Sequence, residues 1–554
     1  MNRTAMGRVA RLAVAGAIGA MLLSACGGGG GASGTPLNGS GGSAGGGSSG
    51  GGNSGGNSGG NAGTQGPIQP SASYAQQCAP GNTEAAANLR TGSLGAEKSW
   101  VRAYLDEAYL WREDVPSIDA SAAAYSGSDV GAALNAYFED LLSPARTASN
   151  KRKDQFSFVM STREWNALSQ GGVEVGYGIE WSMKSPTPPR GLRVAFVEPG
   201  SVADLAGVRR GDTLVTADGA AADVADAAGV NTLNAALFPD TAGTSHRFAL
   251  TSNAGVPRNV TLAAGSITKT PVPTTQVITA ADGAKVGYLL FNDHILTAES
   301  QLITAMQNFS TSGVSDLVVD LRYNGGGYLF IASELAYMIA GGTATSGKTF
   351  EQLRYNSKRA AETSSPDSKT PFYSQSCLLS GNNCTSQQPL PALNLRRVFV
   401  LAQSGTCSAS EALINGLRGV DVDVVLVGGT TCGKPYGFTA KDNCGYSYFP
   451  IEFVGTNNKG FGDYADGFVP AGPGATGVRG CQVADDFNHA LGDANEAMLA
   501  AALQYRSSGT CPAVSPSEAD RATAMGVRRA DGDAVALSLK KLAARSNRII
   551  GGRP

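Results

Sequence analysis

One segment in the second half of the chain constrains the fold most, because it joins an apolar run to a helical pattern through one serine. Residues 397–402 read Arg-Val-Phe-Val-Leu-Ala, which predicts a buried strand, and residues 409–417 predict a helix. Ser408 then lies at the N-terminus of that helix, where free N–H groups and the helix dipole favour developing negative charge. A second apolar run, 422–427, ends shortly before Lys434. The Lys434 ammonium could therefore reach the Ser408 hydroxyl where two neighbouring strands end.

This layout has two explanations. It is the arrangement of a hydrolase with a serine nucleophile and a lysine base, and it is also an ordinary helix start. In Ser-Ala-Ser-Glu at 408–411, the serine and the following glutamate would satisfy N–H groups of the first helical turn. Because helix caps are far commoner than nucleophiles, the segment alone favours a cap. Other segments have to decide between the two.

A second buried strand runs directly into three glycines. Residues 314–321 are mostly apolar, Gly325 to Gly327 follow shortly after, and residues 328–339 have a helical pattern. Glycines at such a place let the backbone approach a ligand closely and point N–H groups at an anion. Phosphate binding would use the same geometry, but no Gly-Lys-Ser/Thr directly follows these glycines, which disfavours a nucleotide loop.

These motifs together resemble the C-terminal processing, or tail-specific, family of serine peptidases. The family's Asp-Leu-Arg-x-Asn-x-Gly-Gly is matched at residues 320–327, Asp-Leu-Arg-Tyr-Asn-Gly-Gly-Gly. The family's nucleophile lies three residues before the Glu of Ser-Ala-Ser-Glu, which implies Ser408 rather than Ser410. Its general base is the lysine of a Gly-Lys pair further along the chain, which implies Lys434.

The resemblance spans roughly residues 99–472 and implies further features. The oxyanion hole would use one N–H from the glycine motif, at Gly325 or Gly326, and one from Ala409. The fold would be a multi-domain α/β architecture, with a crotonase/ClpP-like catalytic core, a helical N-terminal cap and a β-rich PDZ-like domain. Many members have a Gln four residues after the lysine, whereas Phe438 occupies that position here. The residue that orients the lysine therefore stays open.

A lysine can act as a base only when it is neutral. Burial in an apolar site disfavours the ammonium and can lower its pKa by several units, to about 7–8. The neutral amine would take the Ser408 proton as the oxygen attacks a peptide carbonyl, while two N–H groups stabilise the oxyanion. The apolar residues nearby that could provide this environment are Val425, Leu426, Val427 and Phe438.

A Ser-His-Asp triad is the alternative to a Ser-Lys dyad. The chain has three histidines, which are His246, His294 and His489. His294 follows the apolar run 286–291 and could lie near the site, but a histidine in a loop is more often solvated. We therefore expect Lys434 to be the base and keep His294 as the rival.

A PDZ-like domain is predicted at residues 171–268. A short strand at Tyr177 to Trp181 is followed by another strand, a Pro-Gly turn, a short helix ending in Ala-Gly, and Gly-Asp before the next strand. This order resembles PDZ domains, which bind an extended C-terminal tail as an added strand and capture its carboxylate. The carboxylate-binding loop would comprise Tyr177, Gly178 and Ile179. A small β-rich domain without a ligand is the alternative, because Gly and Pro turns alone would look the same.

The N-terminus predicts export and lipid attachment. Residues 1–25 combine a basic start, an apolar run too short for a comfortable membrane span and small residues before a cut, as in a signal peptide. Leu-Ser-Ala-Cys resembles a bacterial lipobox, which implies lipidation of Cys26; an ordinary secretory cut is the alternative. Residues 26–75 are mostly Gly, Ser, Asn and Ala and predict a flexible tether. We expect a lipid-anchored protein of the cell envelope, and the glycine after Cys26 favours the outer membrane, facing the periplasm or the cell surface.

Cysteine usage agrees with export. Once Cys26 is assigned to lipid, eight cysteines remain, and an even number in an oxidising compartment predicts four disulfides. Cys377 and Cys384 are close enough for a local loop, and a bond between Cys407 and Cys432 would brace the site. Zinc is disfavoured because the chain has no Cys-x₂-Cys pair and few histidines. No metal or other cofactor is expected.

The remaining domain boundaries follow from composition and pattern. A helical N-terminal domain is predicted at residues 76–170, with helices near 99–111 and 130–142. A catalytic domain is predicted at 269–511 and a basic C-terminal tail at 512–554. The net charge is −2 and charged residues make up 16% of the chain, without the basic stripe that nucleic acids require. A nucleic-acid partner is therefore not expected.

The leading hypothesis is a membrane-tethered Ser-Lys endopeptidase. Its substrates would be exported proteins whose C-terminal tails are recognised through the PDZ-like domain. A catalytically inactive PDZ scaffold is the first alternative, motivated by Phe438 in place of the usual Gln. A hydrolase of non-protein substrates in the cell envelope is the second.

Overall fold

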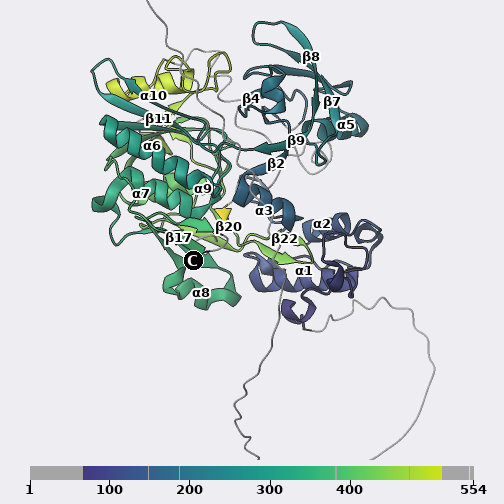
Figure 1. The fold of residues 1–554 in the computed structure, drawn as a ribbon. Coiled ribbons are helices and arrows are strands. Elements are labelled where there is room, and N and C mark those ends of the chain that lie inside the picture. Colours follow the sequence, from purple (N-terminus) through teal and green to yellow (C-terminus); the bar gives the residue numbers. More distant parts are fainter. Residues whose placement is uncertain are drawn as a thin grey trace, which may run out of the picture. The chain divides into compact units, whose positions relative to one another are not determined.

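The largest sheet among the described residues has seven strands, of which Figure 1 labels β11. The structure, a computed structural model, describes residues 67–147, 149–185, 187–380, 383–472, 474–513 and 548–549. β10 runs antiparallel to β11, and all further neighbours in this sheet are parallel. In spatial order the strands are β10 (Thr274–Thr279), β11 (Lys285–Leu290), β12 (Asp316–Asp320), β18 (Arg397–Ala402), β19 (Asp423–Gly428), β25 (Val478–Gln482) and β24 (Pro470–Ala471).

Helices cover both faces of this sheet. α6 (Ala298–Ser312), α7 (Leu329–Thr345) and α9 (Ala409–Gly419) share one buried cluster with it, and α10 (Ala497–Ser508) shares another. On β18, Val398 and Val400 belong to the first cluster, whereas Phe399 and Leu401 belong to the second. A strand buried on both faces needs apolar side chains at every position, so the nearly continuous apolar runs predicted strands correctly.

The N-terminal segment contains two helices and a strand that pairs with the second half of the chain. α1 (Leu94–Ala108) and α2 (Val130–Asp140) match the predicted helices, and each begins after a side chain that accepts an N–H of the first turn, from Ser93 and Asp129. β1 (Phe158–Ser161) leads into α3 (Thr162–Gly171) and pairs antiparallel with β22 (Tyr446–Phe449), which also pairs with β21 (Lys441–Asn443). The N-terminal segment thus shares a sheet with residues that follow Lys434.

Smaller strand groups complete this part. A four-stranded sheet has the order β15 (Lys369–Pro371), β14 (Thr349–Tyr355), β23 (Phe453–Thr456) and β20 (Tyr436–Gly437). A hairpin joins β16 (Leu378–Ser380) to β17 (Asn383–Ser386), and α8 (Ala360–Ser364) follows β14. β13 (Gly327–Tyr328), at the end of the glycine motif, pairs in parallel with β26 (Arg548–Ile549) from the C-terminal tail.

The segment predicted as PDZ-like begins and ends on one strand pair, β2 (Val173–Gly176) with β9 (Gly265–Thr268). Its own sheet runs β3 (Ile179–Ser182), β4 (Arg193–Val197), β5 (Thr213–Ala217), β7 (Ser245–Thr251) and β8 (Pro257–Ala263), with β6 (Ala220–Ala221) on β5. Two helices accompany it, α4 (Val202–Leu205) and α5 (Ala227–Leu237). β3 is therefore an edge strand of a separate β-rich unit with its own buried cluster.

Four disulfides link all eight cysteines that the structure describes. Two were predicted, Cys377–Cys384 and Cys407–Cys432, and two join more distant segments, Cys78–Cys444 and Cys481–Cys511. This number agrees with the predicted framework and indicates an extracytoplasmic location.

Several predictions fall on residues that the structure does not describe. The predicted signal peptide, Cys26 and nearly all of the tether lie outside the described residues, as does most of the tail from 512 onward. Within the described ranges, none of the helices has both the length and the apolar character needed to cross a bilayer.

Candidate active site

Ser408 has a backbone conformation that a plain helix cap does not require. It lies between β18 and α9 with φ 61° and ψ −113°, and its side chain is fully buried. A positive φ is sparsely populated by residues other than glycine, and a cap residue usually has extended backbone angles instead. Strained conformations of this kind cost about 1–3 kcal/mol and cluster at active sites. The strain at Ser408 therefore favours the nucleophile over the cap.

The neighbouring hydroxyl, Ser410, is engaged elsewhere. It donates a hydrogen bond to the carbonyl oxygen of Asn324 at 3.1 Å, and the Cys407 N–H donates to the same oxygen at 3.1 Å. These bonds fasten the turn that carries Ser408 to the glycine motif. Ser410 thus has a positional role, which leaves Ser408 as the candidate nucleophile.

A buried carboxylate, Glu411, holds the segment of Lys434 against the helix of Ser408. It accepts the N–H of Ser408 at 3.0 Å, of Gly433 at 2.9 Å and of Lys434 at 2.8 Å, and the hydroxyl of Thr431 at 2.6 Å. The N–H groups of Ser408 and Lys434 donate to the same carboxylate oxygen. We call Glu411 with these four donors the polar junction. It brings the two predicted catalytic residues together through their backbones.

The electrostatics of Glu411 follow from this setting. Burial raises the pKa of the Glu411 carboxyl above its usual value, while the hydrogen bonds from Thr431, Lys434, Gly433 and Ser408 oppose that rise. The sequence analysis expected Glu411 to accept N–H groups of its own helical turn but missed its bonds to the segment of Lys434. Its position in the first turn of a helix was a signal, because a glutamate there is well placed to accept N–H groups.

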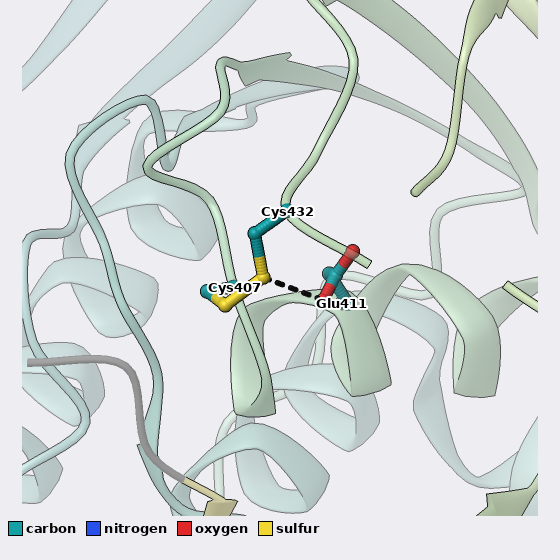
Figure 2. A group of neighbouring side chains, drawn as sticks. All are labelled: Cys407, Glu411 and Cys432. Carbon is teal, nitrogen blue, oxygen red and sulfur yellow. Dashed lines mark hydrogen bonds between the residues drawn. A yellow bond between two sulfur atoms is a disulfide. The ribbon is translucent and has the colours of Figure 1, made fainter. Parts of the chain in front are cut away.

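A disulfide reinforces the polar junction. Cys407 directly precedes Ser408, and its bond to Cys432 ties that turn to the segment of Lys434, as Figure 2 shows. Cys432 Sγ lies 3.3 Å from a Glu411 carboxylate oxygen. The ligand atoms of Cys407, Glu411 and Cys432 lie within 4.8 Å of one another, close enough to share a metal ion. Both sulfurs are in the disulfide, however, and zinc requires thiolates, so this oxidised cluster does not fit the metal.

The side chain of Lys434 is fully buried among aromatic rings. Its Nζ lies 4.6 Å from the ring centroid of Phe438 and 5.1 Å from that of Phe156. Of the apolar residues named as candidates for its surroundings, Phe438 therefore contacts it directly. Val425 and Val427 belong to the cluster on the α10 face of the sheet, and Leu426 to the cluster on the opposite face.

The predicted oxyanion donors lie on either side of Ser408. Ala409 is the first residue of α9, and the N–H groups of a first helical turn have no acceptor within the helix. The Gly326 N–H donates to the side-chain oxygen of Asn324 at 2.9 Å, whereas Gly325 is partly exposed. Gly325 is therefore the better placed of the two glycine candidates.

His294 does not lie in solvent, contrary to what a loop position led us to expect. It is fully buried, its Nδ1 lies 3.0 Å from the side-chain oxygen of Asn324, and its N–H donates to the Gly326 carbonyl at 3.0 Å. Burial lowers the pKa of His294 to about 3. A neutral histidine beside the glycine motif can position that motif, but it is a weak base.

The predicted carboxylate-binding loop leads into the edge strand β3. The Gly178 carbonyl accepts the Glu198 N–H at 2.8 Å, and the Tyr177 carbonyl accepts the Ala203 N–H at 3.1 Å. Gly178 has φ 80°, and a Cβ there would lie 2.4 Å from Ser201, so only glycine fits. Ile179 is the first residue of β3. The loop thus leads directly into a strand at the edge of its sheet, among the residues that the structure describes.

One nucleotide-loop pattern escaped the sequence analysis. Residues 342–349 read Gly-Thr-Ala-Thr-Ser-Gly-Lys-Thr, which matches Gly-x₄-Gly-Lys-Thr. A phosphate-binding loop follows a strand and opens a helix. Here α7 ends at Thr345 and β14 begins at Thr349, so the order of elements is reversed. The pattern is a chance match.

Comparisons with known proteins agree with this geometry. Residues 285–441 match the model of peptidase family S41, and residues 96–158 match the peptidase S41 N-terminal domain. The chain is 26% identical over 336 residues to a chloroplastic C-terminal processing peptidase from Tetradesmus obliquus, covering 58% of this chain and 60% of the relative. It is 25% identical over 190 residues to a carboxyl-terminal-processing protease from Picosynechococcus sp., covering 33% of this chain and 43% of the relative. The chain thus spans less than two thirds of either relative.

A solved structure shares the fold. The crystal structure of a putative S41 protease from Bacteroides fragilis covers 74% of this chain and 97% of its own, with a TM-score of 0.53 and 24% identity. The described residues form a multi-domain α/β fold like that of this S41 protease. The chain is similar to peptidase family S41, a family of serine-type peptidases with a Ser-Lys dyad, over the two matched segments.

Proposed function

We propose that this protein is a serine endopeptidase in which Ser408 is the nucleophile and Lys434 the general base. The observation that carries the proposal is the polar junction, where the N–H groups of both residues donate to one oxygen of Glu411. The strained backbone of Ser408 and the full burial of both side chains agree with it. The bond from the Ser408 N–H to Glu411 is also part of a capping box, but a helix cap needs neither the bond from the Lys434 N–H nor the positive φ of Ser408.

The reaction follows from this arrangement. The neutral amine of Lys434 takes the Ser408 proton as the oxygen attacks the substrate carbonyl, and the N–H groups of Gly325 and Ala409 stabilise the oxyanion. The resulting ammonium returns its proton to the leaving amine as the peptide bond breaks. A water then attacks the acyl-enzyme, again with Lys434 as base, and releases the new carboxylate and free Ser408.

Selection of substrates is assigned to the PDZ-like unit. An extended C-terminal tail would add to the free edge of β3, with its carboxylate at Tyr177, Gly178 and Ile179. Support comes from the edge position of β3 and from the tight turn at Gly178. A lipid on Cys26 would hold the protein at a membrane, so the substrates would be proteins of the cell envelope.

The inactive scaffold remains a second candidate because of one observation. Phe438 replaces the Gln that orients the lysine in many relatives, so a chain with an intact PDZ-like unit could have lost its activity. Cleavage of a protein with a C-terminal tail, by wild type beside Ser408→Ala, separates the two. We expect cleavage by the wild type and a loss of about 10⁶-fold in the variant. An inactive wild type that still binds the tail would establish the scaffold.

The same comparison tests the assignment of the nucleophile. Ser410→Ala should reduce activity only moderately, because that hydroxyl fastens the turn to Asn324. An active-site serine reagent should label wild type but not Ser408→Ala. Loss of labelling in Ser410→Ala alone would move the nucleophile by two positions.

A further inference from the structure

The geometry points to Phe438 and Phe156 as a pair of positioning residues that hold the Lys434 side chain through their ring faces, in the place of an orienting amide. This inference rests on the proposed function, since it assigns a role to the surroundings of the proposed base. The distances from Nζ to the two ring centroids, 4.6 and 5.1 Å, are within the range of cation–π contact.

The ring of Phe438 is held firmly by its neighbours. Phe438 is fully buried and meets Phe158 at 5.8 Å and Phe449 at 5.3 Å between centroids, edge to face in both cases. Phe158 and Phe449 are stacked at 4.3 Å and are directly paired between β1 and β22. We call Phe156, Phe158, Phe438 and Phe449 the aromatic pocket. A ring locked on two sides fixes the position of a cation lying on its face.

Phe156 is held by a turn rather than by packing alone. The buried carboxylate of Asp154 accepts the N–H of Phe156 at 3.0 Å and the hydroxyls of Ser157 at 2.6 Å and Tyr109 at 2.7 Å. This turn precedes β1 and comes from the N-terminal segment. One wall of the lysine's surroundings is thus supplied by residues far from Lys434 in the sequence.

Ring faces and an amide would act differently on the lysine. An amide oxygen accepts one directed hydrogen bond, whereas a ring face attracts the ammonium without fixing a single proton. The rings stabilise the charged form without accepting a directed hydrogen bond from the amine. They therefore position the base at the expense of making its deprotonation harder.

The test uses Phe438→Leu and Phe156→Leu, with Phe158→Leu as the matched control. Phe158 belongs to the same pocket but packs on Phe438 instead of facing the ammonium. We expect each of the first two variants to lower kcat about tenfold with KM nearly unchanged. The acid limb of the pH–rate profile should move to lower pH by about half to one unit, because loss of a ring removes stabilisation of the ammonium.

The control separates positioning from packing. Phe158→Leu keeps both rings that face the ammonium and removes one of the two rings that brace Phe438, so it should lower the melting temperature and move the acid limb by less than either of the first two variants. Phe156→Tyr keeps a ring face, so its pH–rate profile should match that of the wild type. An unchanged acid limb in both Phe438→Leu and Phe156→Leu, or an equal movement in Phe158→Leu, would overturn the inference.

A readout without catalysis distinguishes this inference from the proposed function. In Ser408→Ala, the Lys434 amine can be titrated by NMR of ¹⁵N-labelled lysine, with its signal assigned through Lys434→Met. Phe438→Leu in that background should lower the titration midpoint, whether or not the wild type cleaves peptides. An inactive wild type with a ring-dependent midpoint would refute the peptidase and keep the pair. An active wild type whose titration midpoint does not depend on the ring would support the peptidase and refute the role of Phe438 and Phe156.

Discussion

The two regions that meet at Lys434 hold it by opposite chemistry. The polar junction binds its backbone through a carboxylate that gathers four hydrogen-bond donors, and the aromatic pocket surrounds its side chain with rings. Directed hydrogen bonds fix the backbone of Lys434, whereas its amine has an undirected contact with the two rings. Under the proposed mechanism, the polar junction places the backbone of the base and the rings contact the amine that exchanges the proton.

The strongest way to sharpen this contrast is to change the lysine while keeping its charge. Lys434→Arg retains a cation that the rings can hold, but a guanidinium does not deprotonate in a protein. We expect activity to fall about 10²–10⁴-fold, as in Lys434→Ala, measured as kcat/KM on a tailed protein. Substantial activity in the arginine variant would remove Lys434 from the mechanism and return attention to His294.

Breaking the polar junction should have the next largest effect. In Glu411→Gln the amide would present its own N–H groups to donors, so buried hydrogen bonds are lost at about 1–3 kcal/mol each. We expect kcat to fall about 100-fold, with lower thermal stability. Glu97→Gln is the matched control. Glu97 lies in α1, is also buried and accepts the Ala79 N–H at 2.6 Å. It should lower stability alone, and an equal loss of kcat there would deny Glu411 its specific role.

The disulfide within the junction should matter less for the rate than the carboxylate does. Replacing Cys407 and Cys432 by alanine opens a loop with a separation of 25 residues, which costs about 3 kcal/mol in the chain-entropy account. We expect a lower melting temperature together with a several-fold loss of kcat. The Cys377 and Cys384 pair closes a separation of 7 residues elsewhere, so its double alanine variant should lose stability with kcat retained. Equal rates in both double variants would mean that the Cys407–Cys432 bond is not needed at the site.

Glu198 is a buried glutamate with fewer hydrogen-bond donors than Glu411, and we expect it to have the smallest effect on stability. Burial raises the pKa of Glu198 to about 7, opposed by the Thr270 N–H and the charge of Lys269. Because the folded pKa of Glu198 exceeds the ordinary value of 4.5, the protonated carboxyl favours the folded state. This contribution to the free energy of unfolding is complete below about pH 4.5 and is lost as pH rises through about 7. The hydrogen-exchange protection factors of residues 173–268, which are corrected for the base-catalysed intrinsic rate, should therefore be lower at pH 8 than at pH 5. Glu198→Gln should abolish that difference, and an unchanged pH dependence in the variant would place its cause elsewhere.

Local patterns predicted the elements that carry the site. The strand at 397–402 agrees with β18, the run 422–427 with β19 to within a residue at each end, and the helix after Ser408 with α9. These segments are buried on both faces or begin at a marked turn, so their own residues determine their structure. The fold class was implied by the resemblance of these motifs to a known peptidase family.

Contacts between distant segments could not be predicted in the same way. Nothing in the residues around Phe156 indicates that its ring faces Lys434, because that contact depends on the pairing of β1 with β22. The Cys78–Cys444 bond is of the same kind. His294 was misplaced because a loop position says nothing about what packs over it.

The pairing of β1 with β22 also orders the assembly of the protein. Phe158 is synthesised early, but its partner Phe449 leaves the ribosome only after Ser408 and Lys434 have been made. The wall that Phe156 supplies can therefore close over the lysine only when most of the chain exists. A growing chain therefore contains Ser408 and Lys434 before the contact between Phe156 and the Lys434 side chain can form.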